Sequence, residues 1–363
     1  MADVRPNPIG SELWAQMPVS PDAYPQQLEL ARGLVLVVRL DASAYRAASF
    51  LDDRILGPTT QGAWMSVART SEASQRAAGL RPLHFIFHTG HVGSTLLSRL
   101  LDETGLVLSL REPLPLRTLA DAYDVLGRPE SLLDPTQFAG LLGTFLRLWA
   151  RGYDWTRAVV VKATSSAGRA TVPVLETSPQ SRAIYLNLGA ESYLATLLAG
   201  ENSPQDLRGH GPGRMKRLQA FCSAPPRPLH ELSIGELAAL GWLVETHSQR
   251  TALGHFPERV QGIDFDAFLG DVRGSLERVV QHFGLSPDPA FLARIAQSPV
   301  LGRYSKAPDR PFTREARDEL LRQSRRDHRA EIAKGMAWLE TLARSDPAVA
   351  AVVESGRGPA QRA

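Results

Sequence analysis

Five short runs of apolar residues recur along the middle of the chain, each five or six residues long. Runs of this length that are rich in β-branched, aromatic or leucine residues are typical of buried strands. The runs cover residues 83–87, 106–110, 157–162, 182–187 and 260–265. Between them lie segments with helical spacing of apolar residues. The alternation predicts an α/β fold, in which a parallel β-sheet is flanked by helices on both faces.

The segments between and after these runs predict the helices. We expect helices over residues 118–150, 167–179, 231–254, 276–285 and 313–344. The stretch 200–230 differs, because Gly, Pro and basic residues dominate it, and it predicts a loop-like insert. Residues 346–363 are mostly small and polar, which predicts a flexible C-terminal tail.

The N-terminal part of the chain carries a different pattern. Residues 1–30 are rich in Pro and polar residues and predict an irregular arm, whereas 33–40 and 64–68 predict strands, with a helix from 41 to about 50. We interpret residues 1–80 as an accessory segment that packs on an α/β domain of residues 81–345.

Composition narrows the class of protein. The 363 residues are 43 % hydrophobic, which is enough for a large core, and the net charge of +3 is too small to indicate nucleic-acid binding. The one cysteine, Cys222, excludes an internal disulfide and a multi-cysteine metal site, and it fits a reducing compartment. No signal peptide and no apolar run of membrane-spanning length is evident, so we expect a cytoplasmic protein without integral membrane association.

The first candidate site follows the run at 83–87. Gly90 and Gly93 interrupt the pattern, Ser94 and Thr95 come next, and leucines then recur at helical spacing. A strand, a glycine loop and a helix in this order form an anion site, because glycines allow close approach and the helix start offers unpaired N–H groups. The loop is not a Walker A motif, since Gly93 stands where that motif has its Lys. An ordinary strand-to-helix turn is the alternative.

Two charged residues end neighbouring predicted strands. Glu112 follows the run at 106–110, and Lys162 ends the run at 157–162. Ligands of open α/β sheets gather beyond the carboxyl ends of the strands, so Glu112 is placed for chemistry. The alternatives are a surface Glu112 paired with Arg111 or Arg117, and a Lys162 that merely marks a strand exit.

The sequence Gly-His-Val-Gly-Ser-Thr-Leu-Leu at 90–97 resembles the 5′-phosphosulfate loop of sulfotransferases that use 3′-phosphoadenosine 5′-phosphosulfate (PAPS). In this resemblance His91 takes the basic position of the loop, Val92 replaces a Ser, and Gly93, Ser94 and Thr95 match. A His can donate to a phosphate but is fully cationic only below its pKa. The resemblance covers roughly residues 82–310 and implies the P-loop-like sulfotransferase fold.

The resemblance also implies roles for the two strand-end residues. Glu112 lies at a spacing similar to that of the glutamate base in the tyrosylprotein type, and Lys162-Ala-Thr resembles the Lys-x-Thr signature whose Lys points at the sulfate end of the donor. The segment 264–285 resembles the late signature of the family, which is structural.

This chain differs most from the family at the motif that binds the 3′-phosphate. Where the family has an Arg at the strand end and a Ser eight residues on, this chain has Asn187 and Ala195, with Thr196 one place further. Asn cannot reproduce a bidentate Arg–phosphate contact. Candidates to compensate are Arg303, Ser305 and Lys306 in the loop after 302. Otherwise the nucleotide differs, or donor binding has been lost.

The leading hypothesis is a PAPS-dependent sulfotransferase acting on a hydroxyl or amine acceptor without a metal. Gly90 and the N–H groups of Gly93, Ser94 and Thr95 would hold the 5′-phosphate, His91 and Lys162 would neutralise the transferred group, and Glu112 would remove the acceptor proton. Two alternatives stay open: an ATP-dependent kinase, which would need a divalent metal, and a non-catalytic nucleotide-binding protein. The motifs H-E-x-x-H and G-x-S-x-G do not occur, so zinc hydrolases and serine esterases have no support.

Overall fold

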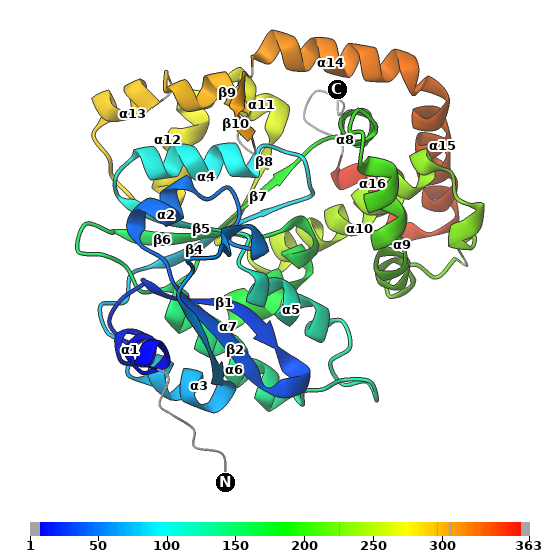
Figure 1. Cartoon of the computed structure of the whole chain (residues 1–363). Helices are drawn as coiled ribbons and strands as arrows, with labels where there is room; N and C mark the ends of the chain where they lie inside the picture. The colour runs from blue at the N-terminus through cyan, green and yellow to red at the C-terminus, as the bar shows by residue number, and fades with distance from the viewer. Residues whose placement is uncertain (1–7, 225, 296, 305–306, 312, 357–363) are drawn as a thin grey trace.

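Five parallel strands form the central sheet of the protein, in the order β5-β6-β4-β7-β8 (Figure 1). The computed structural model describes residues 8–224, 226–295, 297–304, 307–311 and 313–356. The strands are β4 (Leu83–His88), β5 (Val107–Arg111), β6 (Ala158–Lys162), β7 (Ala183–Asn187) and β8 (Val260–Asp264). All five expected strands are confirmed, and so is the predicted α/β fold.

Helices cover both faces of this sheet because successive side chains of each strand point to opposite faces. Ile86, Val160 and Ile184 belong to one buried cluster, and Phe85 and Val161 belong to a second. The first cluster lies under α4 (Ser94–Glu103), α8 (Ala190–Leu198), α10 (Ile234–His255) and α12 (Val272–His282). The second lies over α5 (Leu114–Tyr123), α6 (Pro135–Trp149) and α7 (Thr171–Thr177).

The register of the sheet brings its carboxyl ends to one edge. Lys162 pairs with Arg111 of β5 on one side and with Ile86 of β4 on the other. Asn187 pairs with Asp264 at the end of β8. The strand ends singled out from the sequence therefore share the edge at which open α/β sheets bind ligands.

The N-terminal segment is an antiparallel sheet with three α-helices, rather than an irregular arm followed by strands. Its strands are β1 (Ala23–Glu29), β2 (Leu34–Arg39) and β3 (Gly62–Ser66), and its helices include α1 (Pro8–Gln16), α2 (Ala42–Ala47) and α3 (Val67–Gln75). The expected arm is wrong from residue 8 onward because Leu13, Met17 and Tyr24 bury their side chains in the second cluster.

Two further expectations differ from the structure. The insert expected at 200–230 contains the helix α9 (Ser203–Gln219), which has Pro212 inside it. Its Leu207, Met215 and Leu218 are buried against the first cluster, and this packing outweighs the low helix propensity of its Gly and Pro residues. The helix expected at 118–150 is divided into α5 and α6.

The C-terminal third adds mainly helices. They are α11 (Phe265–Gly270), α13 (Pro289–Ile295), α14 (Arg314–Asp327), α15 (Arg329–Ser345) and α16 (Pro347–Ser355), with β9 (Arg303–Tyr304) and β10 (Ala307–Pro311) as a two-stranded ribbon. Helix α16 lies in the stretch expected to be a flexible tail. It is ordered there because Asp346 caps it and Val349 and Val352 are fully buried.

A buried arginine ties the N-terminal segment to the α/β domain. The guanidinium of Arg151 donates to the carbonyl oxygens of Met17, Ser20 (2.5 Å), Ala23 (3.0 Å) and Leu148 (2.6 Å). Burial lowers the pKa of Arg151 to about 10, which leaves it charged at neutral pH. The segment is therefore held by charge-assisted hydrogen bonds as well as by apolar packing.

Replacing this arginine should loosen the segment. Arg151→Met should lower the free energy of unfolding by roughly 3 kcal/mol or more, because each buried acceptor left without a donor costs about 1–3 kcal/mol. Urea unfolding followed by circular dichroism measures the change. Arg147→Met, at an exposed position of α6, is the matched control and should change little. Equal stability of the two variants would show that the carbonyls find other donors.

Candidate functional site

The loop between β4 and α4 has the backbone of an anion site. Gly90 has φ of 103°, Gly93 has φ of 69°, and His91, between them, has φ of 54°. Gly93 is the N-cap of α4, and a Cβ there would lie 1.9 Å from Cε2 of Phe265. Only glycine fits this position, because it adopts positive φ without a Cβ.

Unpaired donors gather at the start of α4. The hydrogen-bond ladder of the helix begins with the Leu97 N–H, which donates to Gly93 O at 3.0 Å. The N–H groups of Ser94 and Thr95 therefore lie in the first turn, where a helix has no internal acceptors for them. Thr89 and Thr95 are buried, and within the described parts of the chain their hydroxyl oxygens have no hydrogen-bond partner. These groups fit a tetrahedral anion.

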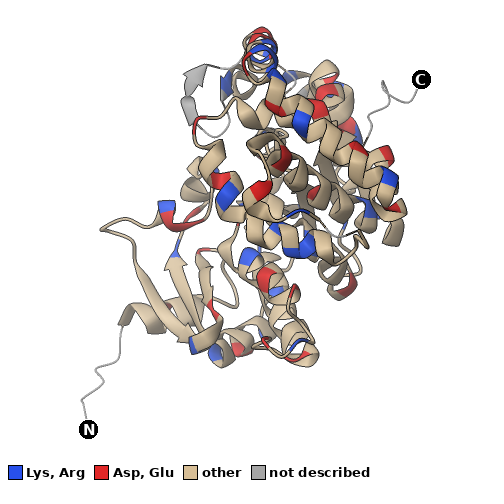
Figure 2. Ribbon diagram, turned by 90° about the vertical axis from the view of Figure 1, so that its right-hand side faces the viewer, with Lys and Arg blue, Asp and Glu red and all other residues tan. Residues whose placement is uncertain are grey.

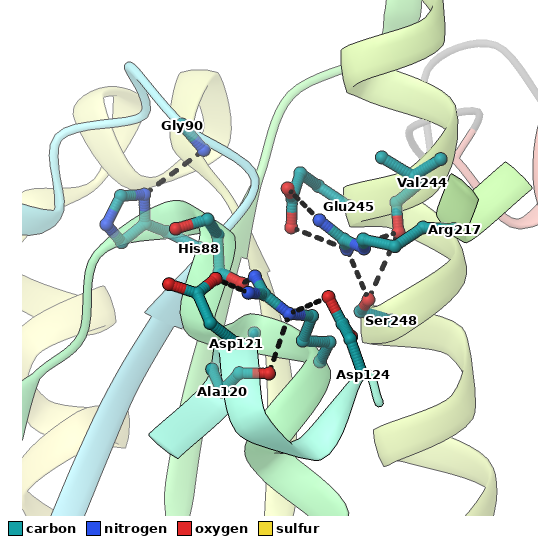
Figure 3. Close-up of polar contacts among 12 residues, drawn as sticks. His88, Gly90, Ala120, Asp121, Asp124, Arg217, Val244, Glu245 and Ser248 are labelled. Atoms are coloured by element: carbon teal, nitrogen blue, oxygen red, sulfur yellow. Dashed lines mark hydrogen bonds and ion pairs between the residues drawn. The ribbon is translucent and has the colours of Figure 1, made fainter. Parts of the chain in front are cut away.

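His88 fixes the path of the loop, and sequence reasoning did not single it out. Its Nδ1 accepts from the Gly90 N–H at 3.1 Å, and its Nε2 lies 2.9 Å from Ala163 O (Figure 3). An acceptor at Nδ1 and a donor at Nε2 describe one neutral tautomer. The imidazole thereby links the loop after β4 to the residue that follows Lys162. The feature of the sequence that could have indicated His88 is a histidine at the end of a predicted buried strand.

Glu112 and Lys162 form an ion pair at the ends of β5 and β6. The Lys162 side chain has no exposed surface, whereas 19 % of the Glu112 side chain is exposed. Glu112 has φ of 56°, and its N–H donates to Lys162 O at 2.6 Å. Within the described residues, His91 and Glu112 are the two non-glycine residues with positive φ. Such strain clusters at functional sites.

Arg111 has a different partner from the one the sequence left open. It forms an ion pair with Asp102, donates from Nε to Ser98 Oγ at 3.0 Å, and donates from Nη1 to Ala48 O at 2.8 Å. Burial, followed by the nearby charges of Arg99 and Arg46, lowers its pKa to about 9. The interpretation of Glu112 as a surface residue paired with Arg111 or Arg117 is therefore wrong, because Glu112 pairs with Lys162.

The N-terminal segment supplies a wall of the site that the sequence did not reveal. The Phe50 ring lies 5.5 Å from Lys162 Nζ, and the Arg54 guanidinium stacks on the same ring at 3.6 Å. Leu51 N–H donates to Arg111 O at 2.7 Å, which joins this loop to the end of β5. Asp52 forms an ion pair with Arg54. Phe50 and Leu51 lie far in the sequence from Lys162 and Arg111, so no local pattern could indicate that this loop reaches the strand ends.

Not all of the polar residues predicted to bind the 3′-phosphate are available at one place in the structure. Asn187 ends β7 beside Asp264, but the Thr196 hydroxyl donates to Ser192 O at 2.7 Å within its own helix. Arg303 is exposed in β9, and Ser305 and Lys306 lie outside the described residues. The Arg317 guanidinium, which the sequence did not single out, lies 5.2 Å from the Phe265 ring and pairs with Asp266 at 2.8 Å. It brings positive charge to this end of the sheet.

Charge over the rest of the molecule is mixed. Lys and Arg alternate with Asp and Glu across the view in Figure 2, as the net charge of +3 leads one to expect. No group of three or more His, Cys, Asp or Glu side chains that could hold a metal ion is found within the described ranges. Each helix of the described chain is too short or too polar to cross a membrane.

Comparison with known proteins finds similarity among solved structures. No protein-family model matches the chain, and no curated protein matches it. The sulfotransferase domain from the curacin biosynthetic pathway is 16 % identical with a TM-score of 0.41, covering 65 % of this chain and 84 % of that chain. Sulfotransferase STF9 from Mycobacterium avium is 12 % identical with a TM-score of 0.39, covering 88 % and 95 %.

Mouse sulfotransferase SULT7A1, solved in complex with PAP, is 12 % identical with a TM-score of 0.33, covering 70 % of this chain and 88 % of that chain. All three structures are sulfotransferases, the family that the loop at 90–97 resembles.

Because Phe265 lies so close to Gly93, we expect a side chain at position 93 to lower the free energy of unfolding. Gly33→Ala should cost about 1–2 kcal/mol, since Gly33 has φ of 62° and open space around it. Gly93→Ala carries the same backbone cost and should lose about 1–3 kcal/mol more from overpacking. Chemical unfolding of both variants measures the difference. Adding Phe265→Ala to Gly93→Ala should recover part of the extra loss, and purely additive effects would contradict the contact.

Proposed function

We propose that the protein is a sulfotransferase that moves a sulfuryl group from PAPS to a hydroxyl or amine acceptor. The observation that carries the proposal is the strained Glu112 paired with the buried Lys162, beside a glycine loop with unpaired donors. Transfer of such a group is in-line and charge-rich, so positioning and electrostatic stabilisation should supply most of the rate.

The loop would hold the 5′-phosphate end of the donor. The N–H groups of Gly93, Ser94 and Thr95 offer donors in a cluster, and the helix start adds a positive partial charge. Gly90 lets the backbone approach without a side chain. His91 is exposed at the outer edge of the loop and would add a proton donor there.

Lys162 and Glu112 would act on the reacting atoms. Lys162 would stabilise the negative charge that develops on the bridging oxygen as the bond from sulfur to that oxygen breaks. Glu112 would accept the acceptor proton while the acceptor oxygen or nitrogen bonds to sulfur. The leaving group is adenosine 3′,5′-bisphosphate, so atoms and charge balance without a metal.

The far end of the donor would be held by residues from several elements. Asn187 and Thr196 are the candidates on β7 and α8, and Arg303, Ser305 and Lys306 those on the ribbon. We add Arg317, because its guanidinium reaches the same end of the sheet. Residues 1–80 would be an accessory segment that closes the site with Phe50, and the single cysteine fits a cytoplasmic protein.

A non-catalytic nucleotide-binding protein is the second candidate. It is favoured by the combination of Asn187, Ala195 and a Thr196 hydroxyl that bonds within its own helix. This candidate shares the loop but predicts no turnover with any acceptor. An ATP-dependent kinase would instead require magnesium.

Ligand-dependent thermal unfolding separates these candidates. A ligand at a hundred times its dissociation constant should stabilise the protein by about 2.7 kcal/mol, which raises the unfolding temperature by a few degrees. We expect this shift with adenosine 3′,5′-bisphosphate in the absence of metal, and a smaller one with AMP. A preference for ATP that depends on magnesium would favour the kinase, and no response to any nucleotide would contradict the proposed donor.

Replacing the proposed base tests the chemistry itself. Glu112→Gln should reduce turnover by about 100-fold or more, the usual range for a general base, while affinity for adenosine 3′,5′-bisphosphate changes little. Initial rates with PAPS and any acceptor found by screening measure the loss. Glu103→Gln, at an exposed position near the end of α4, is the matched control and should keep its activity. Wild-type rates in Glu112→Gln would remove this residue from the mechanism.

A further inference from the structure

Helix α9 carries three basic residues on one face. His210, Arg214 and Arg217 are spaced i, i+4 and i+7, which places them in a row along a helix. Arg214 and Arg217 face α10, with which α9 makes one of the larger helix contacts of the protein, whereas His210 is exposed. The two arginines meet very different surroundings there.

Arg217 is fully satisfied by α10. Its Nη1 and Nη2 donate to the two carboxylate oxygens of Glu245 at 2.7 and 3.1 Å. Nη2 also lies 2.9 Å from Ser248 Oγ and 3.1 Å from Val244 O (Figure 3). A buried cation with a bidentate carboxylate and two further acceptors is a structural element.

Arg214, one turn earlier, faces a glycine. A Cβ built on Gly241 would lie 3.2 Å from both Cζ and Nη1 of Arg214. Gly241 leaves space for the guanidinium but gives it no carboxylate. Arg214 forms no hydrogen bond and no ion pair with any residue that the structure describes, and its Nη1 is buried. An arginine nitrogen removed from water without an acceptor is costly, and an anionic ligand would remove that cost.

Helix α8 connects the surroundings of Arg214 with the glycine loop. Tyr193 of α8 is buried, and its hydroxyl would lie 3.5 Å from a Cβ on Gly90. Burial raises the pKa of Tyr193 to about 12, and the charge of Arg214 opposes this rise. Helix α8 contacts both α9 and α10, so Tyr193 belongs to the helix that packs beside Arg214 and also touches the Gly90 side of the loop.

Two more basic residues surround this position. Burial lowers the pKa of His210, and the charges of Arg214 and Arg117 lower it further. Arg117 lies in the first turn of α5, the helix that begins two residues after Glu112. The charges of Arg214 and Arg117 thus both act on His210, and Arg117 belongs to the helix that follows Glu112.

We propose that Arg214, one turn from His210 on α9, binds an anionic group of the acceptor, so that the acceptor is a carboxylate-, phosphate- or sulfate-bearing alcohol or amine. The assignment of the anion to the acceptor rests on the proposed sulfotransferase function. The anion site itself rests on the surroundings of Arg214. A guanidinium is suited to such oxyanions because it can donate two parallel hydrogen bonds.

The two sides of the loop favour the acceptor over the donor nucleotide as the source of the anion. Gly93 faces Phe265, beyond which lies Arg317 at the ends of β7 and β8. Gly90 faces Tyr193 and Ser165, which follows the strand that carries Lys162. Arg214 belongs to the Gly90 side, near the end of the strand that carries Lys162, and Arg317, a candidate for the far end of the donor, belongs to the Gly93 side.

Anion binding tests the site without any turnover. Titration calorimetry with inorganic phosphate, sulfate and malonate is carried out with saturating adenosine 3′,5′-bisphosphate, so that the loop is filled. Wild type and Arg208→Gln, an exposed arginine of the same helix, should bind at least one anion. Arg214→Gln should bind it about 10- to 100-fold more weakly, the loss expected for a charged hydrogen-bond donor. Arg214→Lys should keep part of the affinity.

The outcomes separate the two proposals. Equal anion affinity in wild type and Arg214→Gln, or no anion binding in wild type, overturns the site. A loss of affinity for adenosine 3′,5′-bisphosphate but not for AMP in Arg214→Gln assigns the anion to the donor and overturns the acceptor assignment. Failure of every variant to bind the bisphosphate, with Arg214-dependent anion binding retained, contradicts the sulfotransferase function and leaves the anion site standing.

Turnover then tests the acceptor class. Hydroxy acids and their methyl esters serve as paired acceptors with PAPS. Arg214→Gln should raise the KM for the acid about 10- to 100-fold with kcat little changed, and it should leave the ester unaffected. Unfolding temperatures of the unliganded variants confirm that folding is intact. Faster turnover of the ester than of the acid by wild type would contradict an acidic acceptor.

Discussion

The buried ammonium of Lys162 is the constraint on which the site depends. A charge without exposed surface is costly unless a counter-charge is held beside it, and Glu112 is that counter-charge. To reach Lys162, Glu112 adopts a left-handed backbone and its N–H bonds Lys162 O. The register of β5 and β6 makes this possible, because Arg111 and Lys162 are paired residues. The parallel pairing of β5 with β6, the strained backbone of Glu112 and the charge of Lys162 therefore depend on one another.

Buried arginines hold the outer elements to this centre. Arg111 and Arg151 donate to carbonyl oxygens of the N-terminal segment, and Arg217 joins α9 to α10 through Glu245. Each of these guanidinium groups is surrounded by acceptors, which is what burial of a cation requires. Against this pattern, the glycine opposite Arg214 stands out as a missing acceptor rather than as ordinary packing. The same clamps bring Phe50 against Lys162, so an N-terminal residue becomes part of the wall.

The sequence could predict the parts that have a local cause. The five strands follow from period and composition, and the loop follows from Gly90 and Gly93 between a strand and a helix. Helix α9 could not be predicted, because packing against α10 outweighs the propensities of its Gly and Pro residues. The position of Phe50 beside Lys162 and that of Gly241 beside Arg214 depend on contacts between distant segments. The pairing of Glu112 with Lys162 needed the strand order, which periodicity does not give.

The two ends of the proposed donor site differ in how strongly packing and hydrogen bonds fix their side chains. The mechanism explains this difference. The reacting end combines a strained glutamate, a buried lysine and a loop fixed by His88, all of which packing over-determines. The nucleotide end has Asn187 and cations from other elements, the exposed Arg303 of β9 and the largely buried Arg317 of α14. Groups that contact a remote part of a substrate supply binding energy but do not touch the bond that changes. Under the proposed function, divergence at Asn187 would therefore alter which nucleotide binds and how tightly, while the chemistry at Lys162 and Glu112 would be retained.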